Sequence, residues 1–349
     1  TGDGKNDLII GTKNGKAYVV SGDNNGSSSI DLSSSSLTGK AEILSSQSND
    51  LFGRNVSGLG DVNGDGNPDF IIGASAHDSQ SLTNNGAAYV VLGSDTALSS
   101  SFNIEDLDNS KSFIIEGLQS QAFLGGEVSY AGDINGDGFN DILVSAQHSN
   151  AGGTEAGAVY VVFGGSTITS TDSFDLNSLD GQNGFALYGS ENQQLGSSIS
   201  SVGDYNGDGL DDILIGAQGN NVGGEAYLVF GEKSDSVTFI RADSSSASST
   251  LNGGTESEII IGGSGSDVVT GGGGADTIRT GAGNDNIIIS DTDFRLIDGG
   301  AGDQDTLSLG SSGIQLDLTK IDSDKIKGIE IIDLGNTNNV LTIDLATII

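Results

Sequence analysis

A unit of about seventy residues recurs along the first two thirds of the chain, and this periodicity constrains the fold more than any other feature. A tyrosine inside a short apolar run marks each copy, at positions 18, 89, 160 and 227, with spacings of 71, 71 and 67 residues. Each unit holds four short runs rich in Val, Ile, Phe and Tyr, separated by Gly, Asn, Asp and Ser, which is typical of strands and tight turns. Repeated four-stranded units predict the blades of a β-propeller, because one unit is too small to bury both of its apolar faces alone.

The strands of each expected blade can be placed along the chain, and together they predict an all-β fold. We predict three complete blades and a fourth blade that lacks its first strand. An elongated sandwich or an array of separate domains is the alternative, and the small size of each unit argues against it. First strands are expected at 51–57, 123–129 and 194–200, second strands at 7–11, 69–73, 141–145 and 212–216, third strands around the four tyrosines, and fourth strands around 43, 113–115, 185–187 and 237–239.

An aspartate-rich loop separates the first and second strands of each unit. It spans 61–69, 133–141 and 204–212, and a truncated copy covers 1–7. Loop positions 1, 3, 5 and 9 carry side-chain oxygens, position 6 is a glycine that permits a sharp turn, and position 7 offers its backbone carbonyl. Calcium prefers about six to eight oxygen ligands, and such a loop supplies them. The predicted metal ligands are Asp61, Asn63, Asp65, Asn67 and Asp69; Asp133, Asn135, Asp137, Phe139 and Asp141; Asp204, Asn206, Asp208, Leu210 and Asp212; and Asp3, Lys5 and Asp7.

Other interpretations of these loops are weaker. Solvated turns that bind nothing would explain one copy, but three full copies and a partial one lie at the same place between the same strands. A helix–loop–helix calcium hand does not fit, because strands flank each loop and position 12 carries no Glu. Magnesium retains its water ligands and is rarely held by protein oxygens alone. The loops therefore predict several bound calcium ions.

The order of these motifs resembles a known repeat. Leu/Phe-Gly, then Gly-Asp-x-Asn-Gly-Asp-Gly-x-x-Asp, then Gly-x-x-Tyr-Val-Val is similar to the FG-GAP repeat of integrin α-subunit propellers and their bacterial relatives, over about residues 1–243. The resemblance implies four-stranded blades, calcium in the hairpin loop between the first two strands, and a seven-bladed ring. The chain departs from the full ring, so we expect about three further blades upstream or a ring completed in another way. The ligand-binding role of integrins is not carried over, because it depends on loops and a partner subunit that this sequence does not contain.

A second repeat, with a period of nine residues, follows a Ser-rich linker at 244–252. Contiguous copies begin at Gly253, Gly262, Gly271 and Thr280, and a degenerate copy begins at Gly299. They resemble the Gly-Gly-x-Gly-x-Asp-x-apolar-x nonapeptide of RTX (haemolysin-type) parallel β-rolls, in which the glycine half and the aspartate bind calcium and the other half forms a strand. The resemblance implies calcium ligands at Asp267, Asp276 and Asp285.

The first nonapeptide departs from this pattern, with Glu256 in place of Gly and Glu258 in place of Asp. A flexible Gly/Ser linker is the alternative for the whole array. The regular apolar positions Val268, Ile278 and Ile287 argue against a linker, and we expect them to face the interior of the roll. The predicted roll covers 253–305, and residues 306–349, which alternate apolar and polar side chains, are predicted to cap it with strands.

Composition narrows the function. The formal net charge of −35 repels nucleic acids and anionic membrane surfaces and favours bound cations. The absence of Cys excludes disulfides, thiolate metal sites and Fe–S clusters. No apolar run approaches the roughly 20 residues of a membrane span, and no cleavable signal peptide is visible. We expect His77 and His148 to lie in surface loops. The sequence contains no nucleophile elbow and no phosphate loop, and calcium accounts for the clustered carboxylates. We therefore do not predict an enzyme.

Three functions remain. The first is a secreted or surface-attached bacterial adhesion or matrix protein, whose partner would be an extracellular protein or glycan, or further copies of itself. The RTX resemblance implies export through a type I secretion channel, followed by folding in extracellular calcium. The second is the accessory part of a secreted hydrolase or toxin whose catalytic domain lies elsewhere. The third is a structural subunit of an extracellular filament or sheath.

Overall fold

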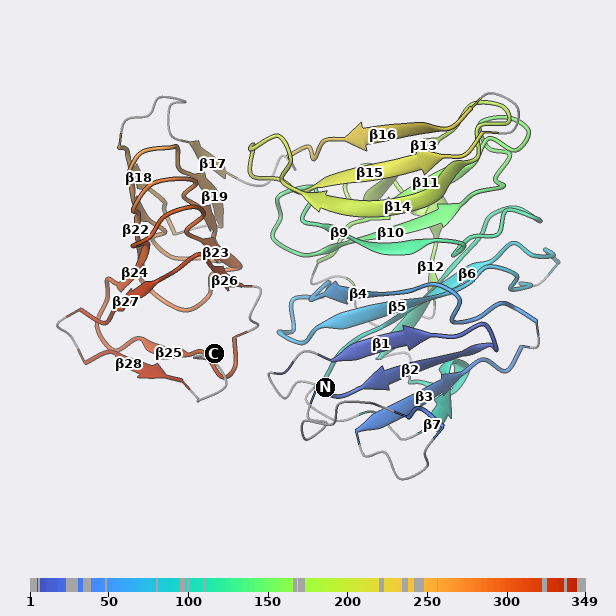
Figure 1. The fold of residues 1–349 in the computed structure, drawn as a ribbon, viewed down its shortest axis with the longest axis horizontal. Coiled ribbons are helices and arrows are strands. Elements are labelled where there is room, and N and C mark those ends of the chain that lie inside the picture. Colours follow the sequence, from blue (N-terminus) through green and yellow to red (C-terminus); the bar gives the residue numbers. More distant parts are fainter. Residues whose placement is uncertain are drawn as a thin grey trace. The chain divides into compact units, whose positions relative to one another are not determined.

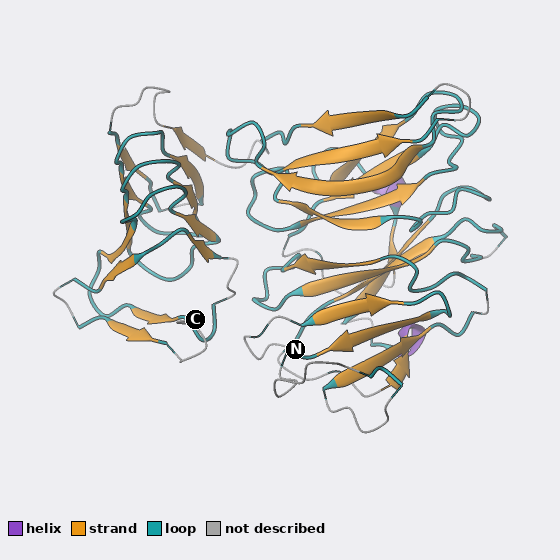
Figure 2. Ribbon diagram, viewed as in Figure 1, coloured by secondary structure: helices purple, strands orange, loops and turns teal. Residues whose placement is uncertain are grey.

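Strands and loops make up nearly all of the described chain (Figure 2). The computed structural model describes residues 5, 7–22, 31–33, 39–47, 49–79, 81–94, 98, 101–108, 111–165, 168, 173–219, 223–233, 238–241, 248–255, 257–321, 325–335 and 338–343. The chain divides into two compact units: residues 1–134, 139–205 and 211–231 form the first, and 135–138, 206–210 and 232–349 form the second. Among the described residues, no helix has the length and apolar character needed to cross a membrane.

Four β-sheets form the first unit (Figure 1), and the strands that each repeat contributes to its own sheet pair in an antiparallel way. Each sheet corresponds to one seventy-residue repeat, so the predicted propeller blades are confirmed. The sheets contain β1 (Leu8–Gly11), β2 (Lys16–Val20) and β3 (Lys40–Leu44); β4 (Val56–Gly60), β5 (Asp69–Ala74), β6 (Ala87–Val91) and β8 (Ser112–Glu116); β9 (Val128–Gly132), β10 (Asp141–Ala146), β11 (Ala158–Val162) and β13 (Gly184–Tyr188); and β14 (Leu195–Gly203), β15 (Asp212–Ala217) and β16 (Glu225–Val229).

Successive blades are joined by apolar side chains on both faces of their central strands. In β10, Ile142 and Val144 belong to the core shared with the β4–β8 blade, whereas Leu143 belongs to the core shared with the β14–β16 blade. All three side chains are fully buried. A strand that is covered on both faces needs a continuous apolar run, which explains why the second and third strands of each repeat do not alternate.

The first strands start later than the repeat predicts. β4 begins at Val56 and β9 at Val128, although strands were expected from 51 and 123. Leu51 and Phe123 hold positive φ angles of 60° and 54°, which a strand does not permit. These residues form a turn before the strand instead.

Two short strands connect neighbouring blades in a way that the sequence did not predict. β7 (Ser101–Asn103) pairs in parallel with β3, and β12 (Ser173–Phe174) pairs in parallel with β8. A 3-10 turn follows each of them, η1 (Ile104–Asp106) and η2 (Leu176–Ser178). Each short strand comes from the next repeat along the chain and covers the outer edge of the preceding blade, which protects that edge from other chains.

The last blade differs from the prediction. A fourth strand was expected around 237–239, but β17 (Thr238–Arg241) pairs in parallel with β19 (Glu258–Ile261) in the second unit. Val237 lies outside the described residues. Among the described residues this blade therefore has three strands, and two blades rather than three have all four.

The second unit contains two five-stranded parallel sheets, as a β-roll requires. Consecutive nonapeptides alternate between the sheets, so paired residues such as Ile260 and Ile278 lie two nonapeptides apart. One sheet contains β17, β19, β21 (Thr277–Arg279), β23 (Leu296–Asp298) and β26 (Ile326–Lys327); the other contains β18 (Thr250–Asn252), β20 (Val268–Thr270), β22 (Asn286–Ile289), β24 (Thr306–Leu309) and β27 (Ile331–Asp333); and β25 (Gln315–Asp317) pairs separately with β28 (Val340–Thr342).

The core of the roll is a column of apolar side chains. Ile278 and Ile287 are fully buried, as predicted, but Val269 takes the inward position of β20 while Val268 is 37% exposed. The expectation for Val268 was wrong by one residue, because strand side chains alternate and the inward residue is the second after each aspartate. β26 and β27 continue the two parallel sheets, so part of the predicted cap extends the roll itself.

Candidate calcium sites

The three full aspartate loops lie where the sequence places them, between β4 and β5, β9 and β10, and β14 and β15. Glycines at loop positions 4 and 6 hold positive φ in each copy, with angles of 76° at Gly64 and 86° at Gly66 in the first. Residues with a β-carbon rarely adopt this conformation. Two such glycines, separated by one residue, fold the backbone into a tight turn and bring positions 1, 3 and 5 together.

In the loop 61–69, the first aspartate accepts backbone hydrogen bonds from within the turn. Asp61 Oδ1 accepts from Gly64 N at 2.7 Å, and Asp61 Oδ2 accepts from Gly66 N at 2.9 Å. Asn63 Nδ2 donates to Asp65 Oδ2 at 3.1 Å, so the side chains at positions 3 and 5 touch. Asn135 and Asp137 make the same contact at 3.0 Å, and Asn206 and Asp208 make it at 2.8 Å.

The aspartate at position 9 connects each loop to the blade. Asp69 Oδ2 accepts from Val62 N at 2.8 Å, and Oδ1 accepts from Gly93 N, just beyond β6, at 2.7 Å. Burial raises the pKa of Asp69 to about 8, while the two amide bonds oppose the rise and the neighbouring Asp61 adds to it. Asp141 and Asp212 repeat the paired amide bonds, at 2.8 and 2.8 Å and at 2.9 and 2.9 Å.

The truncated loop is described only in part. Asp7 Oδ1 accepts from Gly22 N at 3.0 Å, which is the position-9 bond of the other copies. Lys5 is described, but Asp3 lies outside the described residues.

At position 7 of the first and third full loops, Asn67 and Leu210 donate their N–H groups to Asp65 and Asp208 at 2.8 and 3.0 Å.

Within the described chain, no three His, Cys, Asp or Glu side chains converge closely enough to hold a metal ion. The loops explain this in part, because position 3 is an asparagine and position 7 offers only its backbone. The position-9 carboxylate, moreover, is directed at two amides. The donor set still suits calcium, which accepts carboxylate, amide and carbonyl oxygens in flexible numbers. The individual loop ligands therefore stay predictions.

The roll holds its aspartates inside the turns. Asp267, Asp276 and Asp285 are 1%, 4% and 2% exposed. A carboxylate ladder, formed by Asp267, Asp285, Asp305 and Glu330, runs along one side. Each of its members accepts the backbone N–H of a residue one coil earlier, from Ser249 at 2.6 Å, Asp267 at 2.7 Å, Asp285 at 2.8 Å and Asp305 at 2.8 Å.

Two oxygens of this ladder suit a cation as their partner. Asp285 Oδ2 and Asp305 Oδ2 are buried and have no hydrogen-bond partner among the described residues. A buried carboxylate oxygen without a partner is costly, and a bound cation removes that cost. Gly302 leaves the space open, because a β-carbon there would lie 2.7 Å from both carboxylate oxygens of Asp305. The turn therefore fits calcium.

Sequence reasoning missed Asp305 and undervalued Glu258. In the degenerate copy Gln304 is an extra residue between the glycines and the aspartate, which shifts Asp305 out of the nonapeptide register. Glu258 is 5% exposed, and its Oε2 accepts from Gly254 N at 3.0 Å, the place that Asp267 takes on Gly263. The longer glutamate thus occupies the aspartate position of its turn.

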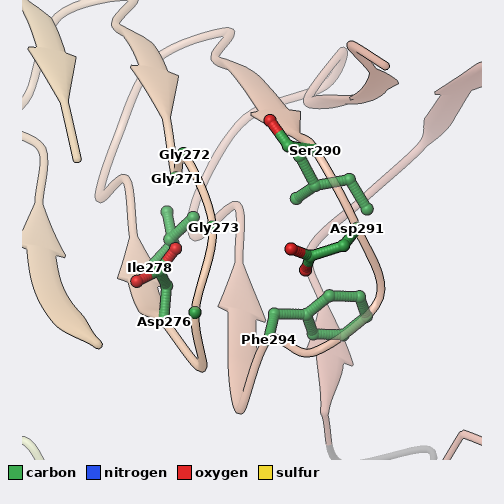
Figure 3. A pocket seen from close by; sticks show the side chains of 10 residues that line it. Gly271, Gly272, Gly273, Asp276, Ile278, Ser290, Asp291 and Phe294 are labelled. Carbon is green, nitrogen blue, oxygen red and sulfur yellow. The ribbon is translucent and has the colours of Figure 1, made fainter. Parts of the chain in front are cut away.

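A small pocket lies between the turn 271–274 and the segment 290–294. Figure 3 shows Asp276 and Asp291 on opposite sides of it. Burial raises the pKa of Asp276 to about 7; Glu258 and Asp291 add to the rise, and the amide bond from Glu258 N opposes it. Two carboxylates that face one small pocket favour either a shared proton or a cation.

The histidines lie apart from these turns. His77 is 5% exposed, so its expected surface position was wrong; its ring lies 3.5 Å from Tyr89 Oη and 3.6 Å from Glu116 Oε1. His148 Nδ1 contacts Glu155 Oε2 at 2.5 Å.

Blades with an aspartate loop in the first hairpin, followed by glycine-rich parallel coils, define a repeat protein of the calcium-binding, extracellular type. The chain carries three copies of the FG-GAP repeat, at residues 52–91, 125–162 and 195–229. It also carries the RTX calcium-binding nonapeptide repeat (4 copies), at residues 252–287. Both repeat types that the sequence indicated are thereby confirmed.

Several known proteins are similar to part of the chain. The chain is 30% identical over 202 residues to phosphatidylinositol-glycan-specific phospholipase D of Bos taurus, covering 54% of this chain and 22% of that protein. It is 32% identical over 190 residues to integrin alpha-5 of Xenopus laevis, covering 53% and 15%. Integrin alpha-3 of Cricetulus griseus is 34% identical over 110 residues, covering 32% and 10%. The chain spans less than a quarter of the length of these relatives.

Proposed function

We propose that this chain is the calcium-binding region of a bacterial extracellular adhesion or surface-matrix protein, which calcium folds and makes rigid after secretion. The observation that carries the proposal is the pair of buried carboxylate oxygens in the roll, on Asp285 and Asp305, that lack a partner among the described residues. Neither repeat type nor composition alone would require a cation at this place. Divalent ions bound at these turns would supply a partner for each oxygen.

The three propeller loops would hold further ions. Positions 1, 3 and 5 are already gathered by the tight turn, and the Asn–Asp contact joins the side chains at positions 3 and 5. Position 9 keeps the loop fixed to its blade. The ligands proposed for the loops are those that the sequence predicts.

Calcium would couple location to folding. With a net charge of −35, the chain repels itself where calcium is scarce, as in a bacterial cytoplasm. An unfolded chain suits a type I secretion channel, and millimolar calcium outside the cell would then stabilise only the folded state. The integrin relatives support adhesion to an extracellular protein or glycan as the role of the exported protein.

A second candidate function rests on another relative. The match to phosphatidylinositol-glycan-specific phospholipase D covers 22% of that protein, so the same repeats also occur beside a catalytic activity. This chain would then be the accessory region of a secreted hydrolase. Adhesion is favoured because calcium would account for the clustered carboxylates of the described residues.

The test of the calcium proposal is circular dichroism during metal exchange. At a urea concentration that the calcium-loaded fold withstands, EGTA should abolish most of the β-signal, Ca²⁺ should restore it, and Mg²⁺ at the same concentration should not. An unchanged spectrum in EGTA at that urea concentration would contradict calcium-dependent folding. Adhesion is tested separately, by measuring binding of the calcium-loaded chain to immobilised extracellular proteins and glycans; equal binding of a chain with an unrelated calcium roll would contradict a specific adhesive role.

A further inference from the structure

Neighbouring propeller loops are joined by backbone hydrogen bonds. Asn140, at position 8 of the second loop, donates its N–H to Asp61 O at 3.3 Å. Asp211, at position 8 of the third loop, donates its N–H to Asp133 O at 3.0 Å. In both pairs position 8 of one loop contacts position 1 of the preceding loop. Position 1 is the residue whose carboxylate the proposed calcium site uses.

Asp211 makes a second bond that the other position-8 residues do not share in the described structure. Its Oδ2 accepts the N–H of Asp133 at 2.9 Å, so Asp211 bonds both the backbone N–H and the backbone carbonyl of Asp133. The side chain of Asp211 is 9% exposed and lies over Gly132, where a β-carbon would collide with its carboxylate. The glycine therefore makes room for this contact.

The place of Asp211 is fixed by its own loop. Its neighbour Asp212 accepts from Tyr205 N at 2.9 Å and from Gly231 N at 2.9 Å. These bonds tie the end of the loop 204–212 to its beginning and to the end of β16. Asp211 thus lies between the end of its own loop and the backbone of Asp133.

We propose that Asp211 is a positioning residue that couples calcium binding in the loop 204–212 to calcium binding in the loop 133–141. The inference rests on the proposed function, because it requires both loops to bind calcium. Calcium in the loop 204–212 orders Asp211, and Asp211 then holds the position-1 residue of the neighbouring loop ready for its own ion. Such coupling is reciprocal, so each ion raises the affinity for the other.

The experiment is hydrogen exchange with mass spectrometry on the full chain, at increasing calcium concentration. It follows peptides that cover 128–141 and 195–212 separately. Asp204→Asn weakens calcium binding in the third loop, and its effect on the second loop measures the coupling. We expect Asp204→Asn to raise the calcium midpoint for protection of 128–141 about fivefold or more. In an Asp211→Ala background the same substitution should leave that midpoint unchanged.

Two further variants separate positioning from loss of structure. Asp211→Asn retains an oxygen that accepts the Asp133 N–H, so it should preserve the coupling. Glu191→Ala removes an exposed carboxylate and should change neither midpoint. Circular dichroism at saturating calcium identifies variants that fail to fold.

The outcomes distinguish this inference from the calcium assignment. Calcium-dependent protection of both peptides, with no shift of 128–141 upon Asp204→Asn, would overturn the coupling alone. An equal shift in the Asp211→Ala background would also overturn it, because the coupling would then pass through other contacts. The absence of calcium-dependent protection in the unchanged chain would overturn both proposals.

Discussion

Asp305 carries a carboxylate oxygen that lies inside the roll with no hydrogen-bond donor among the described residues. We expect Asp305→Asn to act in opposite directions with and without calcium. In EGTA it should leave stability unchanged or raise it, because it removes an unsatisfied buried charge. In calcium it should lower the free energy of unfolding by about 1–3 kcal/mol, because a metal ligand is lost. Urea unfolding in the two buffers measures both effects.

Asp303→Asn is the matched control. Asp303 lies two residues before Asp305, but its side chain is exposed, so the substitution removes the same charge from the surface. It should change stability by no more than about 0.5 kcal/mol in either buffer. If Asp303→Asn and Asp305→Asn behave alike in calcium, Asp305 does not bind the ion.

Asp69 predicts how the calcium-free protein responds to pH. Its carboxyl pKa is raised from 3.8 to about 8, chiefly by burial. The folded state therefore binds this proton more tightly than the unfolded state, so the contribution of Asp69 to stability is greatest below about pH 4 and falls as pH rises towards about 8. Calcium favours the ionised form and should flatten this dependence. Urea midpoints in EGTA between pH 5 and pH 8 test the sign, and Asp69→Asn should reduce the slope; a midpoint that rises with pH in EGTA would contradict it.

The glycine-rich turn before β24 tests how closely the coils approach. A β-carbon at Gly302 would collide with Gly283 O and lie 2.7 Å from both carboxylate oxygens of Asp305, whereas one at Gly273 would meet only Asp291, at 3.6 Å. Gly302→Ala should therefore lower the free energy of unfolding by about 1–3 kcal/mol. Gly273→Ala, the control, should cost about 0.5 kcal/mol or less. Equal costs in urea unfolding would mean that the coils do not approach as described.

Elements with a strong local signal could be predicted from the sequence. The central strands and the three full aspartate loops are found where expected, because apolar runs and paired glycines act within a few residues. The partner of Thr238–Arg241 could not be predicted, since a short β-forming segment fits an antiparallel blade or a parallel roll equally well. The parallel strands β7 and β12 are too short to leave a pattern.

The candidate sites divide in the same way. Asp267, Asp276 and Asp285 occupy a fixed place in a nonapeptide, so the nonapeptide alone predicts them as ligands, and the structure buries all three. Asp305 follows an inserted residue, so its role appears only when the coils are stacked. The other copies do not have an aspartate at loop position 8, so the repeat does not single out Asp211. Its contact with Asp133 depends on how two blades pack. Contacts between repeats are not encoded in the spacing of any one repeat.

The charge of the whole molecule leads to a final prediction. The 48 acidic and 13 basic side chains give a formal net charge of −35, so without calcium the folded chain holds many like charges close together. Salt shortens the range of this repulsion, from a Debye length of about 10 Å at 0.1 M to about 3 Å at 1 M. In EGTA the urea midpoint should therefore rise steadily with NaCl. In calcium the rise should be smaller, because bound ions have already neutralised the closest carboxylates. Choline chloride at matched ionic strength is the control, because it screens charge as NaCl does but contains no sodium. If screening alone acts, the two salts should raise the urea midpoint equally. A midpoint in EGTA that is independent of either salt would mean that repulsion between carboxylates does not limit the calcium-free fold.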